Sequence, residues 1–395
     1  MKLFGGSGHN SQNKKNRGTP PKNRGEVERT NINNEEPKKK GKAVKVILII
    51  LAVLVLIAGG VFAYWKISTR PPETPPSTES AAPIKATQQY YSLLVVGDDQ
   101  EGGNTDTIML VRFDTVNMKV NVLSIPRDTL VNSSLGNKKI NAVYHNLDGI
   151  TSLMDAVEDI AGFRPNNYVV VDTNVFVKVV DAMGGVEFDV PFDMDYDDYA
   201  DKDEDGICEY VFTIHLKEGQ QKLSGYDALG VFRWRQNNNG SGHVYSNPDI
   251  ERINTQHNLL MAIARKAMST KNVVTLTNIA SAVLDKCVTD LTIGNIQWYI
   301  EQFLQMSMEN IEFFTMPTTG AWINKVAYVT INTDEWMDMV NANFNPYETE
   351  IKKENCSILY LAKPKELVNG QLYINSDDLD ITDGSEINTN FIKGK

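Results

Sequence analysis

Three short apolar runs, separated by turn-forming residues, give the clearest pattern of apolar and polar positions in the chain. They predict strands at Ser92–Val96, Thr107–Phe113 and Lys119–Ile125, because short apolar runs bounded by turn signals are typical of buried strands. The stretch Asp114–Met118 between the second and third strands suits a tight connection. If consecutive strands pair antiparallel, the end of the first, the start of the second and the end of the third lie at one edge of the sheet.

Helical and extended patterns alternate after these strands. One apolar face in Gly149–Ala161 predicts a helix, and a second helix is expected at Asn174–Met183, before a pair of glycines. Strands are expected on either side of the second helix, at Asn167–Asp172 and Val186–Val190. This alternation indicates helices packed on a sheet.

The last third of the chain predicts further helices and strands and then a polar tail. The elements expected are a helix capped by Asn247 that starts at Pro248, two helices between Asn272 and Met308, and strands at Glu312–Met316 and Ala327–Ile331. From Pro346 to Lys395 the pattern is polar and weakly periodic. We expect a loosely ordered tail there, with one strand near Ser357–Leu361.

The amino-terminal part predicts a membrane anchor. Residues 1–45 are rich in Asn, Gly, Lys and Pro and carry a net charge of +8, whereas Val46–Trp65 holds 20 residues without a charge. Twenty apolar residues are enough to cross a hydrocarbon core of ~30 Å. A cleaved signal peptide is the alternative, but its basic region would not usually be 45 residues long.

The flanks of this segment predict its orientation. Lysines precede it and a proline-rich linker, residues 66–87, follows it. We therefore expect a single-pass protein of the cell membrane with a cytoplasmic amino terminus. A large extracellular domain is expected at 88–318, followed by a partly ordered carboxyl-terminal extension at 319–395.

Charge and cysteine content narrow the class of protein. The chain carries −11 overall, so the part after the basic tail carries −19. Because basic residues before a membrane span are explained by topology, we expect no nucleic-acid partner. The three cysteines, Cys208, Cys287 and Cys356, predict no disulfide framework, and the 42% of apolar residues can supply an ordinary core.

Charged residues gather at the predicted sheet edge. They are Asp98, Asp99, Asp106, Arg127 and Asp128. Carboxylates bind hard cations, and arginine recognises phosphate through two parallel hydrogen bonds. The alternative is a set of turn-forming aspartates beside a solvated arginine, but the combination favours a site.

A second group of charged residues follows later in the chain. If Phe232–Gln236 is extended, Arg233 and Arg235 point to one side and Trp234 to the other. On the helix after Asn247, the polar residues Asp249, Arg252 and Gln256 fall near its apolar face. This favours a helix start that faces a polar cleft, where an anion would be stabilised; an ion pair on the surface is the alternative.

Other chemistry finds less support. No Walker A sequence and no G-x-S-x-G motif is present, which disfavours a nucleoside triphosphate ligand and a serine hydrolase. The segment from Asp193 to Glu209 is predicted to be an acidic loop. Its Asp201, Asp203 and Asp205 resemble the start of a calcium loop, but Phe212 stands where the last glutamate ligand would be.

Four short motifs resemble the LytR-CpsA-Psr family of Gram-positive cell-wall enzymes. They are VVGDD at 95–99, TDTIMLV at 105–111, SIPRDT at 124–129 and KINAVY at 139–144. The resemblance covers about residues 90–268 and implies an α/β fold with a central mixed β-sheet flanked by helices. The chain departs from many members at Thr255, and at Asn104 and Thr105, where they carry arginines.

The resemblance also implies roles for residues. Magnesium would be held by Asp99 and Asp106, and Arg127 and Asp128 would be catalytic. The implied pyrophosphate ligands are Arg127, Arg233, Arg235, Arg252 and Gln256, with Lys139 and Asn141 in support. The general base and the residues that line a lipid slot are not assigned.

The implied activity is a phosphotransferase of the cell wall. Such an enzyme moves an anionic glycopolymer, of the teichoic acid or capsular polysaccharide type, from a polyprenyl diphosphate carrier to peptidoglycan. A pyrophosphatase acting on the same carriers and a non-catalytic envelope regulator that binds them are the alternatives.

Overall fold

The computed structural model describes residues 53–57, 59, 69–72, 90–98, 105–199, 210–238, 240, 242–243, 245, 248–362 and 371–392. The chain divides into two compact units, Met1–Phe62 and Ala63–Lys395. In the first unit, residues 53–57 are helical. Among the described residues we find no helix with the length and apolar character needed to cross a bilayer. Most of the predicted span, 46–65, lies outside the described residues and stays a prediction.

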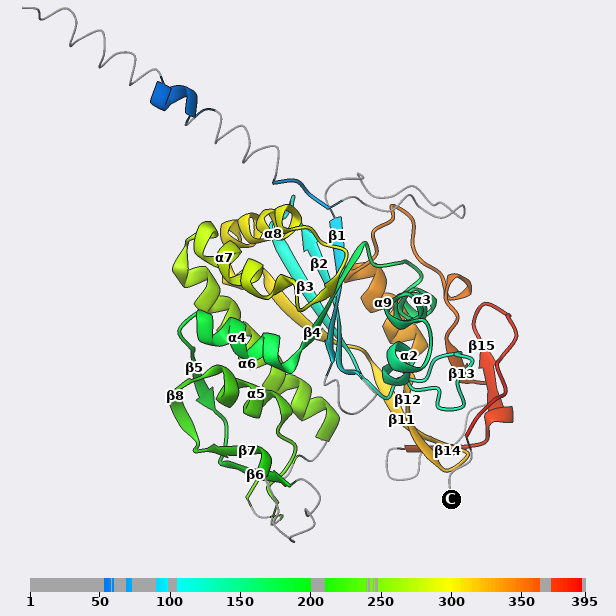
Figure 1. The fold of residues 1–395 in the computed structure, drawn as a ribbon. Helices are drawn as coiled ribbons and strands as arrows, with labels where there is room; N and C mark the ends of the chain where they lie inside the picture. The colour runs from blue at the N-terminus through cyan, green and yellow to red at the C-terminus, as the bar shows by residue number, and fades with distance from the viewer. Residues whose placement is uncertain are drawn as a thin grey trace, which may run out of the picture. The chain divides into compact units, whose positions relative to one another are not determined.

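A mixed six-stranded sheet forms the centre of the second unit (Figure 1). Its order is β10 (Ile311–Thr315), β3 (Lys119–Ile125), β2 (Thr105–Asp114), β1 (Tyr90–Asp98), β4 (Asn167–Asp172) and β9 (Val288–Thr289). The pairs β1–β2 and β2–β3 are antiparallel, which confirms the predicted arrangement, whereas β1–β4 and β3–β10 are parallel.

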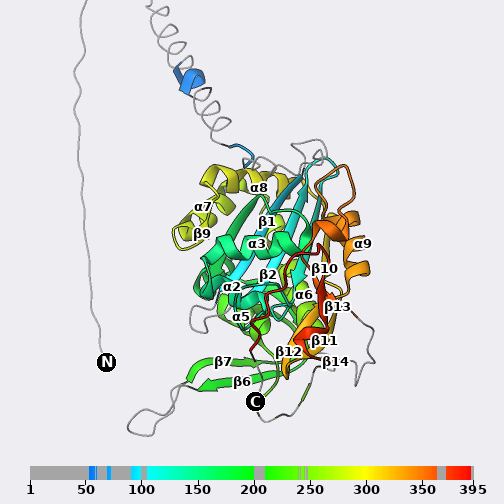
Figure 2. The ribbon, with the colours of Figure 1, turned by 90° about the vertical axis from the view of Figure 1, so that its right-hand side faces the viewer.

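Helices cover both faces of this sheet because its strands bury apolar side chains on both. On one face Leu94, Ile108 and Leu123 pack against α2 (Ile140–Asn146), α3 (Gly149–Ala161) and α9 (Thr333–Asn343). On the other, Met109, Val111 and Val122 pack against α6 (Pro248–Thr270) and α8 (Ile293–Gln305), with α7 (Val273–Leu284) beside α8 (Figures 1 and 2). The predicted helix–sheet–helix layering is confirmed.

The chain between β4 and α6 forms a smaller layer beside this core. It consists of α4 (Thr173–Ala182), β5 (Val186–Val190), β6 (Met194–Tyr199), β7 (Tyr210–Leu216), β8 (Gly219–Leu223) and α5 (Gly225–Arg233). The strands form two antiparallel pairs, β5–β8 and β6–β7, over a core of their own.

The acidic segment from Asp193 was wrongly predicted to be a loop throughout. Its first part is strand β6, which pairs with β7 because Met194, Phe212, Ile214 and Leu216 bury one apolar side despite the many aspartates. The calcium-loop candidates Asp201, Asp203 and Asp205 lie outside the described residues.

The carboxyl-terminal part is more regular than the sequence predicted. A three-stranded sheet has the order β12 (Val326–Ile331), β11 (Thr318–Ile323) and β14 (Gln371–Ile374), and β13 (Leu359–Leu361) pairs with β15 (Leu379–Ile381). Three-residue 3₁₀ turns lie at Met308–Asn310, Lys353–Asn355 and Ser376–Asp378. The strand expected near Ser357–Leu361 is present as β13. The expectation of a loosely ordered tail was wrong for its described residues, because these short strands bury alternate apolar side chains against β11 and β12.

Several elements match their predicted limits residue for residue, namely β3, α3, β4 and β5. Strand β11 and helix α9 were missed. Helix α9 buries Trp336, Met337 and Val340 in the same cluster as the central sheet. The predicted domain limits stay predictions.

Candidate active site

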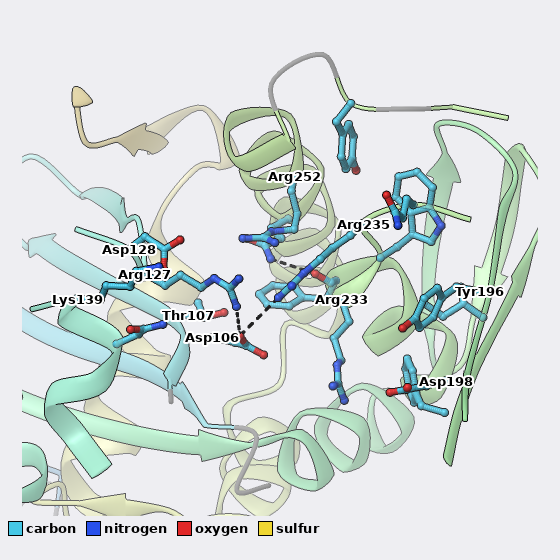
Figure 3. Close-up of a pocket in the computed structure, with 18 of the residues that line it drawn as sticks. Asp106, Thr107, Arg127, Asp128, Lys139, Tyr196, Asp198, Arg233, Arg235 and Arg252 are labelled. Carbon is cyan, nitrogen blue, oxygen red and sulfur yellow. Dashed lines mark hydrogen bonds and ion pairs between the residues drawn. The ribbon is translucent and has the colours of Figure 1, made fainter. Parts of the chain in front are cut away.

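A cavity of about 830 Å³ opens where the edge of the central sheet meets α6 and the β6–β7 hairpin (Figure 3). The lining residues are Asp106, Thr107, Arg127, Asp128, Asn137, Lys139, Asn141, Tyr196, Asp198, Phe212, Ile214, Phe232, Arg233, Trp234, Arg235, Gln236, Tyr245, Arg252 and Gln256. Five of these are cationic and three are carboxylates, so the lining has a net positive charge in an acidic chain. Such a cavity favours an anionic ligand.

Arg127 and Asp106 form the centre of the cavity at the sheet edge. Arg127 follows the end of β3, Asp106 lies at the start of β2, and the guanidinium nitrogen lies 2.9 Å from the carboxylate oxygen. The antiparallel pairing brings them together, as the sequence predicted. Arg127 Nε is buried and has no hydrogen-bond partner among the described residues, so an oxygen of a ligand could still accept from it.

A second pair lies beside the first. Lys139 Nζ is 3.1 Å from Asp128 Oδ1, and it lies over the Tyr328 ring at 5.9 Å. Asn141 Oδ1 is buried without a hydrogen-bond partner within the described part of the chain. Backbone hydrogen bonds fix these residues, since Asn141 N–H donates to the Arg127 carbonyl at 3.1 Å.

The segment around Trp234 differs from its prediction. Arg233 is the last residue of α5 rather than part of an extended segment, and Trp234 is buried with its indole N–H donated to Asn237 Oδ1 at 3.1 Å. The Arg233 guanidinium lies over the Phe212 ring at 5.0 Å, whereas Arg235 lies 3.8 Å from Asp106 (Figure 3). The two arginines line one cavity but face different parts of it, because the helix continues to Arg233.

Helix α6 supplies Arg252 and Gln256, as predicted. Gln256 donates to the Phe232 carbonyl at 3.0 Å and so ties α6 to the end of α5. At Thr255, where the resemblance implies an arginine, the hydroxyl lies 3.2 Å from the Tyr245 hydroxyl, and burial raises the pKa of Tyr245. The side chain of Asp249 lies outside what the structure describes.

The two aspartates that the sequence places after the first strand have different outcomes. The Asp98 carboxylate lies within hydrogen-bond distance of His145 Nε2, at 2.7 Å, and Asp98 is not among the residues that line the cavity. Asp99 lies outside the described residues. Among the described residues no group of three or more His, Cys, Asp or Glu side chains could hold a metal ion.

The oxygen ligands that are present in the cavity nevertheless suit magnesium. It is usually bound through one or two carboxylates together with phosphate oxygens and water. Asp106 is a partly exposed carboxylate in the cavity, and Asn141 adds a buried oxygen without a partner among the described residues. Asp106 would hold the ion, with Asp99 as the predicted second ligand.

Sequence reasoning missed the wall that faces the sheet edge. Tyr196, Asp198, Phe212 and Ile214 come from β6 and β7, and Asn137 precedes α2. No local signal marks these residues, because only the packing of the hairpin brings them to the cavity.

The fold and the cavity together define an α/β protein with a cationic site suited to a phosphorylated ligand. The chain belongs to the LytR_cpsA_psr family, whose model matches residues 63–345.

Similar proteins include a teichoic acid transferase, a cell-wall biosynthesis protein and a regulatory protein. Polyisoprenyl-teichoic acid–peptidoglycan teichoic acid transferase TagV of Bacillus subtilis is 31% identical over 195 residues, 48% of this chain and 46% of TagV. Cell wall biosynthesis protein LcpA of Corynebacterium glutamicum is 28% identical over 59% of this chain and 46% of LcpA. Regulatory protein MsrR of Staphylococcus aureus is 25% identical over 67% of this chain and 74% of MsrR. The chain spans about half the length of TagV and of LcpA.

Solved structures share the fold. The crystal structure of B. subtilis TagV has a TM-score of 0.52 and 23% identity, and the match covers 65% of this chain and 96% of that one. A structure of TagT bound to LI-WTA has a TM-score of 0.52 and 19% identity, with 71% of this chain and 98% of that one covered.

Proposed function

We propose that this protein is a membrane-anchored phosphotransferase that moves an anionic glycopolymer from a polyprenyl diphosphate carrier to peptidoglycan on the outside of the cell. The observation that carries the proposal is the meeting of Arg127 and Arg235 on Asp106 in a net cationic cavity. Membership of the family and the name of TagV support the substrate class.

The reaction requires a site that holds a diphosphate and stabilises developing charge. A hydroxyl oxygen of the acceptor forms a bond to the phosphorus that carries the glycopolymer. The bond from that phosphorus to the bridging oxygen breaks, polyprenyl phosphate leaves, and the hydroxyl proton goes to a base. Positioning and electrostatic stabilisation supply most of the catalysis in such transfers.

The arginines of the cavity meet this requirement. Arg127 keeps one buried nitrogen for a phosphate oxygen while another binds Asp106. Arg235, Arg252 and Gln256 line the same space and add donors around the diphosphate. Lys139 orients Asp128 beside Arg127 and supports its position.

Magnesium is part of the proposal. When bound at Asp106 and Asp99, it would neutralise negative charge on the phosphate oxygens. Calorimetric titration of magnesium in the presence of a polyprenyl diphosphate tests this point. Wild-type affinity in Asp106→Ala and Asp99→Ala would remove both residues from the metal site.

Incubation of the full-length protein with lipid-linked glycopolymer and an acceptor glycan tests the function. Transfer of the polymer to the glycan is the expected result. Release of the polymer by water alone would identify a pyrophosphatase of the carrier. Binding of the carrier without either reaction would favour an envelope regulator, a role that the name of MsrR suggests.

A further inference from the structure

The carboxyl-terminal end of the described chain lies along a loop that leads into the cavity. Residues 386–392, which we call the strap, contact residues 132–139, which we call the site loop. The site loop lies between β3 and α2, and its Asn137 and Lys139 line the cavity. The match to the family model ends at residue 345. A segment outside that match therefore supports one of the family motifs.

Hydrogen bonds join the strap to the site loop along its length. The side-chain amide of Asn132 donates to the Glu386 carbonyl at 3.0 Å, and its oxygen accepts from the Asn388 N–H at 2.8 Å. Further along, the Ile392 N–H donates to the Gly136 carbonyl at 2.9 Å. A β-carbon on Gly136 would lie 2.9 Å from the Ile392 side chain. The two segments are thus in close contact at both ends.

A fully buried lysine forms the centre of this contact. Lys138 is 0% exposed, and its ammonium group donates to the carbonyls of Ser133 at 2.6 Å and Leu135 at 3.2 Å. The Phe391 ring of the strap lies over the ammonium, with the nitrogen 4.9 Å from the ring centroid. A charged group that is removed from water needs such partners. The ring therefore covers the ammonium and stabilises its charge.

The backbone links this buried lysine to the cavity. Lys139 is extended, with φ −77° and ψ 136°, and neighbouring side chains of an extended chain point to opposite sides. With Lys138 held under the strap, Lys139 points into the cavity, where its Nζ lies 3.1 Å from Asp128 Oδ1 (Figure 3). The Lys138 carbonyl is fixed as well, since it accepts from the Val131 N–H at 2.9 Å.

We infer that the strap positions the diphosphate site: Phe391 holds Lys138 in its buried place, and Lys138 in turn directs Lys139 towards Asp128. Phe391 and Lys138 are positioning residues, since neither lines the cavity. The inference rests on the proposed function and adds to it a segment outside the family match. Without the ring, water reaches the ammonium and competes for the two carbonyls, so the site loop loses its fixed conformation.

Amide hydrogen exchange of the full-length protein in detergent measures this conformation directly. In Phe391→Ala, peptides that cover residues 130–141 should exchange faster, because the hydrogen bond from Val131 to Lys138 opens more often. Phe391→Leu keeps most of the apolar volume but not the ring face, and should exchange nearly as fast. Leu379→Ala is the matched control, because Leu379 is buried in the same apolar cluster as Phe391 but belongs to β15.

Calorimetric titration with polyprenyl diphosphate extends the test to the site. Phe391→Ala should weaken binding roughly three- to tenfold, the range expected when about one hydrogen bond is lost. Lys138→Met keeps the length of the side chain without its charge and should weaken binding by a similar factor. Because the strap acts through Lys138, the double variant should bind no more weakly than the weaker-binding single variant.

Faster exchange and weaker binding in Phe391→Ala, both absent in Leu379→Ala, support the inference. Wild-type exchange in Phe391→Ala, or an equal increase in Leu379→Ala, would overturn it. Faster exchange with wild-type binding would also overturn it, as would additive losses in the double variant, because the strap would then act independently of Lys138. If the wild type itself binds no polyprenyl diphosphate, the proposed function fails, whereas the exchange result still decides whether the strap holds the loop.

Discussion

Arg127 is fixed more firmly than Arg235, the other arginine that lies close to Asp106. Its side chain is 26% exposed and paired with Asp106, whereas that of Arg235 is 53% exposed and 3.8 Å from the same carboxylate. Lysine keeps the charge but loses the planar fork of donors. We predict that Arg127→Lys lowers the transfer rate at least roughly tenfold, which corresponds to ~1.4 kcal/mol, and that Arg235→Lys lowers it less.

The control for this prediction comes from the neighbouring helix. Arg265 is exposed on α6, so Arg265→Lys should transfer at the wild-type rate. Arg112 is less suitable, because it lies at the far end of β2, donates to the Asn343 carbonyl at 2.6 Å and lies over the Tyr90 ring. Equal transfer rates in the lysine variants at 127, 235 and 265 would mean that the arginines at the sheet edge do not bind the phosphate groups.

His257 predicts a dependence of stability on pH. Its Nε2 is 2.7 Å from Ser124 Oγ, Phe313 lies beside it, and burial lowers its pKa to about 4. An unfolded histidine titrates near pH ~6.5, so between the two values the unfolded state binds a proton that the folded state does not. The contribution of His257 is therefore complete above pH ~6.5 and is lost as the pH falls towards 4.

Urea unfolding at neutral pH and near pH 5 measures this effect. The free energy of unfolding should fall between the two conditions by less in His257→Gln than in the wild type. The uncharged lining around the ring, Asn254, Asn258 and Met261, makes a competing charge effect small. An identical fall in both proteins would show that His257 titrates normally in the folded state.

At the scale of elements, the carboxyl-terminal sheet holds the site in place. Val329 of β12 donates to the Asp128 carbonyl at 2.9 Å and accepts from Leu130 N–H at 2.8 Å. The segment that carries Arg127 and Asp128 is thus fixed between β12 on one side and Lys138–Asn141 on the other. Strand β12 lies some two hundred residues further along the chain, yet it fixes the position of Arg127 and Asp128, which local motifs already mark.

The sequence could predict features that depend on local patterns but not those that depend on such long-range contacts. β3, α3, β4 and β5 were predictable because their apolar periodicity is local. Arg127 and Asp106 could be brought together by reasoning from antiparallel pairing alone. Arg233 was misplaced because nothing local shows that α5 continues through it. The cavity wall from β6 and β7 was missed because it depends on tertiary packing of an acidic segment.

Helix α9 offers a test at this scale. Trp336 is 0% exposed, and its indole N–H donates to the Ile160 carbonyl at 2.6 Å, joining α9 to α3 under the sheet. Trp336→Ala should lower the free energy of unfolding by ~3–5 kcal/mol through the cavity and the lost hydrogen bond. Urea denaturation measures it, with Asp338→Ala on the exposed side of α9 as the control. If Trp336→Ala lowered the free energy of unfolding by less than Asp338→Ala does, α9 would be only loosely packed against the sheet.

At the scale of the whole molecule, charge is divided along the chain and around the site. A tail of +8 precedes a remainder of −19, yet the cavity in that remainder has a cationic lining. The net negative charge of the remainder repels anions at long range, whereas the cationic lining favours a phosphate group that reaches the cavity. This arrangement suits a ligand delivered on a membrane carrier rather than one captured from bulk solvent.

The orientation of the chain in the membrane is the prediction on which delivery depends. Residues 38–45 hold a cluster of lysines directly before the apolar stretch, and prolines follow it. Lysine-rich flanks stay in the cytoplasm, so the domain from residue 88 onward should be outside. Protease added to intact protoplasts should remove this domain and leave an epitope tag at the amino terminus intact, whereas detergent should expose the tag as well. If the domain resists protease until detergent is added, it lies inside, and a reaction with peptidoglycan at the cell surface is excluded.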